Sequence, residues 1–188
     1  MDKEKSKEKR SIGFWICCFL VYCVIGWIYE VIWEFKVGNG FVNRGFLYGP
    51  YLPIYGFGVL TLLLILNKLL KTKIKLFKKV NITPILVFIS ILIIVSTIEF
   101  VASWGMEAIF HKRWWDYSYD KFNIDGRISL RNSSLLAIGA FALIYLVQPV
   151  LNKTIGKTTK KKINITGGII AAIMAIDFII TIAGYIIK

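Results

Sequence analysis

The chain has 188 residues and a net charge of +13, 56% of its residues are hydrophobic, and its mean hydropathy is +0.64. A soluble domain of this size cannot bury so much apolar surface, and the apolar residues form long runs, so the composition excludes a soluble fold and predicts a polytopic membrane protein. The lysines lie in short segments between the runs, where they act as topology signals, so the charge predicts contact with membrane lipids and no nucleic-acid partner.

The first hydrophobic run, residues 12–35, follows a charged tail over residues 1–10. The run is too long for the core of a signal peptide, contains tryptophans and lacks a small-residue cleavage site, so it is expected to remain as a transmembrane helix. Its three cysteines, Cys17, Cys18 and Cys23, are interpreted as small apolar helix residues rather than as disulfide partners or metal ligands.

Four further apolar runs approach or exceed the roughly 20 residues that a transmembrane helix needs. Together with the first run they predict an all-α bundle of about five spans, forming a single membrane domain over residues 1–188. The further runs cover residues 54–70, 84–110, 131–151 and 166–187.

The segment NRGFLYGPYLPIYGFG, residues 43–58, leads into the second run and is apolar, yet its prolines and glycines oppose a regular helix. Gly49-Pro50 and Pro53 are expected to set turns, and Gly56 and Gly58 to permit close helix contact. Non-helical backbone at membrane depth has to be buried in protein or reached by water. Two interpretations stay open: a re-entrant or broken helix inside the bundle, and an extracellular turn.

The distribution of positive charge predicts the orientation of the chain. Sixteen of the 24 lysines and arginines lie in residues 1–10, 67–79 and 152–163, which five spans place on one side. The positive-inside rule makes that side the cytoplasm. The N-terminus is therefore expected to be cytoplasmic and the C-terminus extracellular.

Acidic residues inside the spans are the strongest functional signal, because an ionised carboxylate at the bilayer centre costs about 2.5–3.5 kcal/mol. In the third span, Ser96, Glu99, Ser103 and Glu107 share one helical face, and in the first span Glu30 and Glu34 are one turn apart. Both rows of polar side chains lead towards the extracellular side of the membrane. These acids either pair with arginines to hold the bundle together or line a ligand or translocation path; we favour the path for Glu30 and Glu99, and pairing for Glu34 and Glu107. Asp177 lies in the last span without an evident partner.

The predicted outer side also carries the basic and aromatic residues that suit such pairing. Arg44 precedes the broken segment, and Arg113, Arg127 and Arg131 are candidate partners for the glutamates. Trp114, Trp115, Tyr117 and Tyr119 are typical of an interfacial aromatic belt.

Three ordered motifs resemble a known family: FVNRGFLYGPYLPIYGFG (41–58), RWWDYS (113–118) and FNIDGRISL (122–130) are similar to the ABC-transporter type IV permease family of bacterial membrane proteins. The resemblance implies a multi-pass subunit of a bacterial plasma membrane, assembling with an ATPase or other membrane subunits. The chain departs from the family pattern at Ala137, where a tryptophan is expected. The matching positions are Asn43, Arg44, Gly45, Gly49, Pro50, Pro53, Tyr55, Gly56, Trp115, Asp116, Tyr117, Ser118, Asn123, Gly126, Arg127 and Ser129.

The leading hypothesis is therefore a transport subunit. The sequence contains no P-loop, GxSxG or HExxH motif, and no cofactor or metal is predicted. One alternative is an intramembrane enzyme that clamps a lipid or lipid-linked substrate at the outer leaflet through Arg44, Asp116, Arg127 and Glu99. Another is a non-catalytic assembly or sensor subunit. The substrate-path candidates are Glu30, Glu99, Arg44, Asn43, Tyr55, Asp116, Arg127 and Asn123, and the expected structural residues are Gly49, Pro50, Pro53, Gly56, Gly58, Trp115 and Tyr117.

Overall fold

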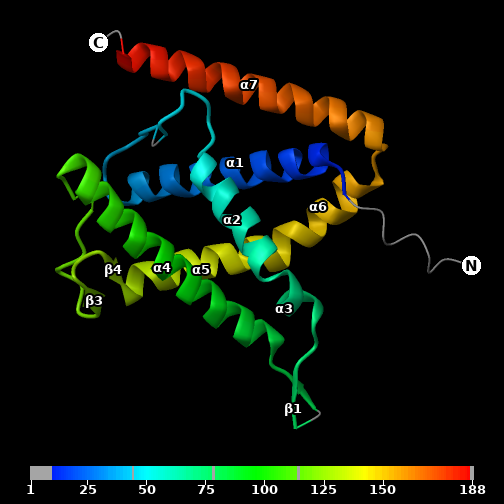
Figure 1. Cartoon of the computed structure of the whole chain (residues 1–188), viewed down its shortest axis with the longest axis horizontal. Coiled ribbons are helices and arrows are strands. Elements are labelled where there is room, and N and C mark those ends of the chain that lie inside the picture. Colours follow the sequence, from blue (N-terminus) through cyan, green and yellow to red (C-terminus); the bar gives the residue numbers. More distant parts are fainter. Residues whose placement is uncertain (1–9, 44, 78, 114, 187–188) are drawn as a thin grey trace, which may run out of the picture. The chain divides into compact units, whose positions relative to one another are not determined.

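The computed structural model describes residues 10–43, 45–77, 79–113 and 115–186 (Figure 1). The predicted tail up to residue 9, Arg44 and Trp114 lie outside the described residues. In chain order the elements are α1 (Ile12–Lys36), α2 (Pro53–Ile65), α3 (Asn67–Lys71), β1 (Lys75–Leu76), β2 (Val80–Asn81), α4 (Thr83–Phe110), β3 (Asn123–Ile124), β4 (Ile128–Ser129), α5 (Leu130–Ala142), η1 (Leu143–Val147), α6 (Gln148–Thr154), η2 (Ile155–Lys157) and α7 (Lys160–Ile186).

The predicted all-α membrane fold is confirmed, with one difference in the second span. Among the described residues, four helices are long and apolar enough to cross a membrane: Ile12–Lys36, Thr83–Ile109, Leu130–Lys157 and Lys160–Gly184. The expected span at residues 54–70 is instead the 13-residue α2 followed by the short α3. Thirteen residues rise only about 20 Å, less than the roughly 30 Å hydrocarbon core, because the prolines keep the preceding residues out of the helix.

The chain divides into two compact units, and each is described by itself. Unit 1 comprises the described residues up to Leu60 and those from Val147 onwards, and unit 2 comprises Thr61–Leu146. The chain passes between them within α2 and within η1. The single membrane domain stays a prediction.

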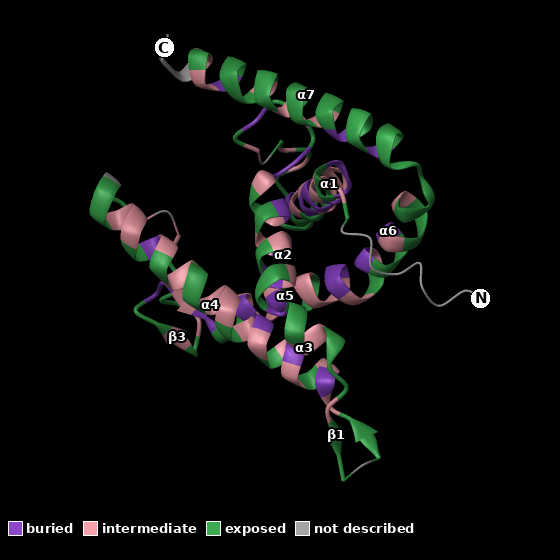
Figure 2. Cartoon of the chain, turned by 45° about the vertical axis from the view of Figure 1, so that its right-hand side comes forward, coloured by how far each residue is buried: buried purple, intermediate pink, exposed green. Residues whose placement is uncertain are grey.

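Unit 1 is built on the pair α1 and α7, which run in the same direction (Figure 1). Near their first turns the two backbones approach closely: a Cβ on Gly167 would lie 2.6 Å from the Cα of Gly13, and a Cβ on Gly13 would lie 2.6 Å from the Cα of Asn164. Small residues at such a crossing allow helices to pack tightly. Buried residues recur along α1, whereas α7 is largely exposed (Figure 2), as expected for a helix facing lipid.

The core of unit 1 lies along one face of α1. Phe14, Cys18, Tyr22 and Cys23 are almost completely buried there, and both cysteines are free. This burial confirms that Cys18 and Cys23 act as apolar helix residues. The Tyr22 hydroxyl donates to the side-chain carbonyl of Gln148 in α6, so the buried phenol is satisfied.

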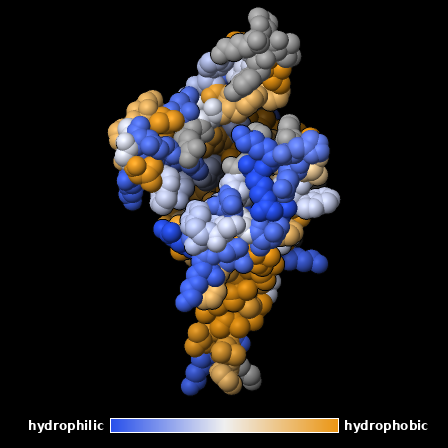
Figure 3. Space-filling view, turned by 90° about the vertical axis from the view of Figure 1, so that its left-hand side faces the viewer, coloured by the Kyte–Doolittle hydropathy of each residue, from blue (hydrophilic) through white to orange (hydrophobic). Residues whose placement is uncertain are grey.

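Unit 2 is built on α4 packed against α5. Val87 and Ile91 of α4 and Ala137 of α5 are completely buried, and the rings of Phe88 and Phe141 meet edge to face at 5.9 Å. Because Ala137 is completely buried, a larger side chain there has to displace its neighbours. Hydrophobic residues cover the lower part of Figure 3, at the level where Figure 1 draws the N-terminal half of α4.

Two minimal hairpins flank α4. The β1–β2 hairpin is tied to the start of α4, because the Thr83 hydroxyl accepts from the Ile74 amide at 2.9 Å and donates to the Thr72 carbonyl at 3.0 Å. The β3–β4 hairpin turns at Asp125 and Gly126, whose φ values of 51° and 63° define a type I′ turn. Its turn hydrogen bond joins the Arg127 amide to the Ile124 carbonyl at 3.0 Å.

Candidate functional site

The non-helical segment before α2 lies against the middle of α1. The Leu52 amide donates to the carbonyl of Cys23, near the midpoint of α1, at 3.0 Å. Leu47 and Tyr51 are buried in one apolar cluster with Cys23. The segment is therefore packed within unit 1 and reaches the middle of α1, as the interpretation of a broken or re-entrant helix requires.

Glycines set the close fit of this segment. Gly56 packs under Phe19 and Cys23, where a Cβ would come within 2.6 Å of either side chain. Gly26 of α1 leaves room in the same way for the ring of Tyr55. Gly58 differs from the expectation, because no described atom lies within 4 Å of the position that its Cβ would take.

Asp177 of α7 holds the Gly49-Pro50 turn in the middle of the segment. Its carboxylate accepts from the backbone amides of Tyr48 at 3.1 Å and Gly49 at 3.0 Å, and from the Tyr51 hydroxyl at 2.5 Å. Pro50 lies between these donors in a tight turn, in which the Tyr51 amide donates to the Gly49 carbonyl at 2.8 Å. A carboxylate that the sequence left without a partner thus fixes the fold of the Gly-Pro turn.

Glu30 of α1 holds the end of the segment. It accepts a hydrogen bond of 2.7 Å from the hydroxyl of Tyr55, in the first turn of α2. Asn43, at the start of the segment, accepts from the indole of Trp27 at 2.7 Å. Pro53 begins α2, as expected from its fixed φ angle. The sequence candidates Glu30, Tyr55 and Asn43 therefore all take part in fastening the segment to α1.

In unit 2, Glu99 of α4 is surrounded by neutral donors. Its carboxylate accepts from Asn132 at 2.7 Å, from Ser133 at 3.2 Å and from the Tyr117 hydroxyl at 3.3 Å. Within the described part of the chain, no salt bridge reaches Glu99. Burial, together with the nearby Glu99 carboxylate, raises the pKa of Tyr117, which therefore stays a hydrogen-bond donor at neutral pH.

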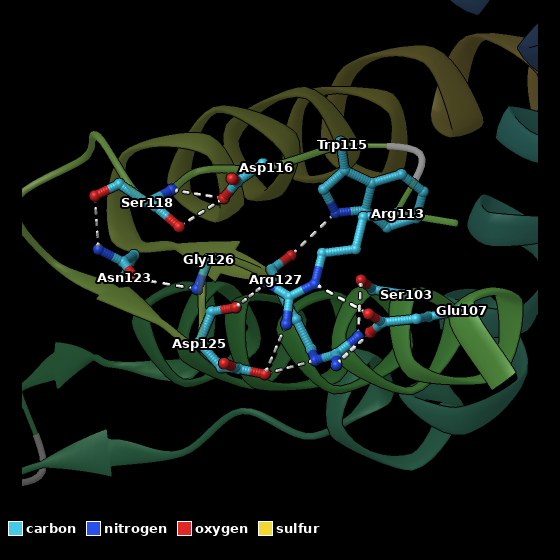
Figure 4. Close-up of polar contacts among 10 residues, drawn as sticks. All are labelled: Ser103, Glu107, Arg113, Trp115, Asp116, Ser118, Asn123, Asp125, Gly126 and Arg127. Carbon is cyan, nitrogen blue, oxygen red and sulfur yellow. Dashed lines mark hydrogen bonds and ion pairs between the residues drawn. The ribbon is translucent and has the colours of Figure 1, made fainter. Parts of the chain in front are cut away.

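Glu107, two turns further along α4, is held by arginines instead (Figure 4). Arg127 binds it at 2.5 Å and Arg113 at 3.3 Å, and both arginines also bind Asp125, at 2.7 Å and 3.4 Å. The hydrogen bond from Arg127 holds the pKa of Asp125 below its usual value, and the bonds to both acids raise the pKa of Arg127. The Arg127 side chain is only 8% exposed, so this ion-pair cluster has a structural role: it connects α4 to the loop between α4 and α5.

The loop before α5 is closed by further contacts to the β3–β4 turn (Figure 4). The indole of Trp115 donates to the Arg127 carbonyl at 2.9 Å, and the Tyr117 amide donates to the Gly126 carbonyl at 2.7 Å. Asn123 accepts from the Gly126 amide at 2.9 Å. These bonds bring the second and third sequence motifs together as one folded loop.

Asp116 caps its own turn within this loop. Its carboxylate accepts from the backbone amide of Ser118 at 2.9 Å and from its hydroxyl at 2.5 Å, and the hydroxyl contact holds the pKa of Asp116 below its usual value. A Cβ on Gly126 would come within 2.4 Å of Asp116 and Ser118, which explains the glycine at this point of the turn. Asp116 and Arg127 are both engaged in contacts that hold the loop.

The predicted site residues thus fall into two separate surroundings. In unit 1, Glu30 binds Tyr55 and Asn43 binds Trp27, whereas Glu99, Asp116, Asn123 and Arg127 lie in unit 2. Sequence reasoning missed the role of Asp177, whose partners are 126–129 residues away along the chain. It also missed the β3–β4 hairpin, which an Asp-Gly pair between alternating polar and apolar residues signals.

The fold and these sites define a class of protein: a polytopic helical membrane protein whose spans contain carboxyl groups satisfied by internal hydrogen bonds. A family model described as "Putative ABC-transporter type IV" matches residues 17–182. The match covers most of the chain, and the protein belongs to this family, as the three motifs predicted. No curated protein and no solved structure shows significant similarity to the chain.

Proposed function

We propose that the protein is the membrane-embedded permease subunit of an ABC transporter and that it works with a separate ATPase subunit. The observation that carries this proposal is the β1–β2 hairpin, which lies in a lysine-rich segment. The non-helical segment that reaches the middle of α1 completes one crossing together with α2 and α3, and with this crossing the positive-inside rule assigns the hairpin to the cytoplasm. A permease subunit needs an element on that side through which ATP hydrolysis acts on the spans. This hairpin is joined directly to α4 through Thr83.

The tip of the hairpin has the features of a docking element. Phe77 is 87% exposed and adopts a left-handed conformation with φ of 48°, which is unfavourable for a bulky residue. Leu76 and Val80 beside it are also exposed. An exposed aromatic residue flanked in the sequence by Lys75 and Lys79 is complementary to an acidic surface with an apolar pocket, so we assign the ATPase subunit as the partner.

Carboxyl groups in the spans support a substrate path. Among the described residues, Glu30, Glu99 and Asp177 have hydroxyl and amide donors and no salt bridge to lysine or arginine. A ligand that brings its own positive charge can replace such neutral donors more readily than it can replace an arginine. We therefore propose a cationic substrate, and Glu99 as a residue that contacts it.

Affinity purification of the tagged full-length protein from its native membrane tests the role. We expect an ATPase subunit to co-purify, and Phe77→Ser to reduce its yield at least about tenfold, as loss of an interface anchor does. Ile124→Ser is the matched control, because Ile124 is an exposed apolar residue on the other hairpin, β3–β4. Equal loss with both variants, or absence of any ATPase from the wild-type preparation, would contradict the proposal.

The rate of ATP hydrolysis by the complex of this protein with the ATPase subunit, measured in proteoliposomes, tests the proposed substrate path. We expect Glu99→Gln to lower stimulation of the ATPase by an applied mixture of organic and inorganic cations, without altering co-purification. Glu107→Gln, on the same face of α4, is expected to reduce stability and to leave the stimulation per folded complex unchanged. Stimulation that is insensitive to Glu99→Gln removes this residue from the path.

A further inference from the structure

A pocket of about 380 Å³ lies in unit 2 where the β3–β4 hairpin meets the start of α5. It is separate from the Glu99 site and from the arginine cluster, and none of the contacts described for either uses its basic side chains. Its lining residues are Asp120, Lys121, Phe122, Leu130, Arg131 and Ser134.

The polar half of the pocket is arranged for an anion. Arg131 has a side chain that is 72% exposed, and among the described residues its ion pair is with Asp120, at 3.8 Å. Lys121 brings a second exposed cation. The Asp120 carboxylate is 13% exposed and accepts from the Ser129 hydroxyl at 2.6 Å, so the acid is turned inward while both cations reach the solvent.

The other half of the pocket is apolar and continuous with a membrane span. Phe122 and Leu130 are exposed by 67% and 53%, and the Lys121 ammonium lies 5.8 Å from the centre of the Phe122 ring. Leu130 is the first residue of the apolar helix Leu130–Lys157. A ligand that fills both halves therefore carries an anion next to a hydrocarbon chain, at the level where a span leaves the bilayer.

We propose that this pocket binds the phosphate headgroup of an anionic membrane phospholipid. The planar guanidinium of Arg131 and the ammonium of Lys121 contact phosphate oxygens, and the Ser134 hydroxyl lies at the same wall. Phe122 and Leu130 contact the first methylene groups of the acyl chains. The bound lipid would fix the β3–β4 hairpin and the start of α5, and this role does not depend on the transport function proposed above.

Binding can be measured on the purified full-length protein with short-chain phosphatidylglycerol, short-chain phosphatidylcholine and inorganic phosphate as probes. We expect phosphatidylglycerol to bind most tightly. The double variant Lys121→Gln/Arg131→Gln is expected to weaken that binding about 30-fold, given the typical contribution of two basic residues at a membrane surface. The matched control Lys112→Gln/Lys153→Gln removes two exposed lysines elsewhere and is expected to leave it unchanged.

Phe122→Ala separates a lipid site from a simple anion site. It is expected to weaken phosphatidylglycerol binding several-fold and to leave the weak binding of inorganic phosphate unaltered. The lipid proposal is overturned if inorganic phosphate binds as tightly as phosphatidylglycerol, if the control variant loses as much affinity as the double variant, or if the double variant binds like the wild type. Unfolding curves without added lipid identify any variant that fails to fold, and Phe122→Ala then decides alone.

Discussion

The acids of the two units are held by different chemistry. In unit 1, Asp177 and Glu30 accept hydrogen bonds from backbone amides and tyrosine hydroxyls, whereas in unit 2 Glu107 and Asp125 are bound by two arginines. The neutral contacts lie well inside α1 and α7, and the arginine contacts lie at the end of α4, where Glu107 is 37% exposed. Inside a span, a cation would add its own dehydration penalty, and a neutral donor avoids it.

Glu99 extends the same distinction within unit 2. It lies two turns deeper in α4 than Glu107, and its partners are Asn132, Ser133 and Tyr117. Depth along one helix therefore separates a carboxylate with neutral partners from one with ionic partners.

Of the substitutions considered, removal of the Arg127 side chain should destabilise the protein most. Arg127→Ala leaves Glu107 and Asp125 without their closest cation and opens a buried space, so we expect the melting temperature to fall by about 10 °C. Arg113→Ala, which touches the same two acids from a more exposed position, should cause less than half of that fall. Thermal unfolding of the solubilised protein measures both, and equal effects would refute a dominant role for the buried arginine.

Removing Asp177 should release the Gly-Pro turn of unit 1. Asp177→Ala leaves the amides of Tyr48 and Gly49 and the hydroxyl of Tyr51 without their acceptor, and we expect a fall in melting temperature of about 5 °C with faster proteolysis at residues 43–52. Asp177→Asn keeps one acceptor oxygen and should lower the melting temperature by about half as much as Asp177→Ala. Thr181→Val removes a weaker contact of 3.4 Å and serves as the control, with little change expected.

A smaller effect is expected where α1 and α7 cross. Gly167→Ala places a methyl group against the backbone of Gly13 and should lower the melting temperature by about 3 °C. Gly168→Ala is the adjacent control, because no atom of the described residues lies within 4 Å of the new methyl group. That variant should be neutral or slightly stabilised through its higher helix propensity. The reverse order of stability would mean that the crossing is not a close contact.

The smallest expected effect is a pH dependence of the stability of the folded protein. Arg127 holds the pKa of Asp125 below the ordinary value of 3.8, so the folded state prefers the ionised carboxylate. That contribution is complete well above pH 3.8 and is lost as the pH falls towards the lower pKa of the folded state. The melting temperature should therefore decline more steeply below about pH 4 in the wild type than in Asp125→Asn. The two slopes should differ only in this range.

Much of the membrane architecture could be predicted from hydropathy, because each long span is an uninterrupted apolar run. The face that carries Glu99, Ser103 and Glu107 was also predictable from helical spacing, and the structure turns this face towards α5 and the loop. The loop motifs indicated which residues matter, and the type I′ turn was available from Asp125-Gly126.

The partners of the acids could not be predicted, because they depend on which distant segments meet. Asp177 binds a turn more than 120 residues earlier, and nothing in the apolar pattern of the last span indicates this. The sequence offered arginines as candidate partners for the glutamates and could not name the amide and the two hydroxyls that Glu99 binds. Whether a carboxylate has neutral or ionic partners is decided by its depth in the helix and by the segments that meet it, rather than by its residue type.

The π-helical turn Leu143–Val147 comes directly before Gln148 and Pro149. Pro149 cannot donate a backbone hydrogen bond and would clash with the carbonyl one turn earlier, and the wider turn before it relieves that conflict. One additional residue rotates everything beyond it by about 100° relative to a regular helix. Gln148 follows this turn directly and accepts from the Tyr22 hydroxyl, so deleting a single residue in the turn would move Gln148 out of phase with the phenol that it satisfies.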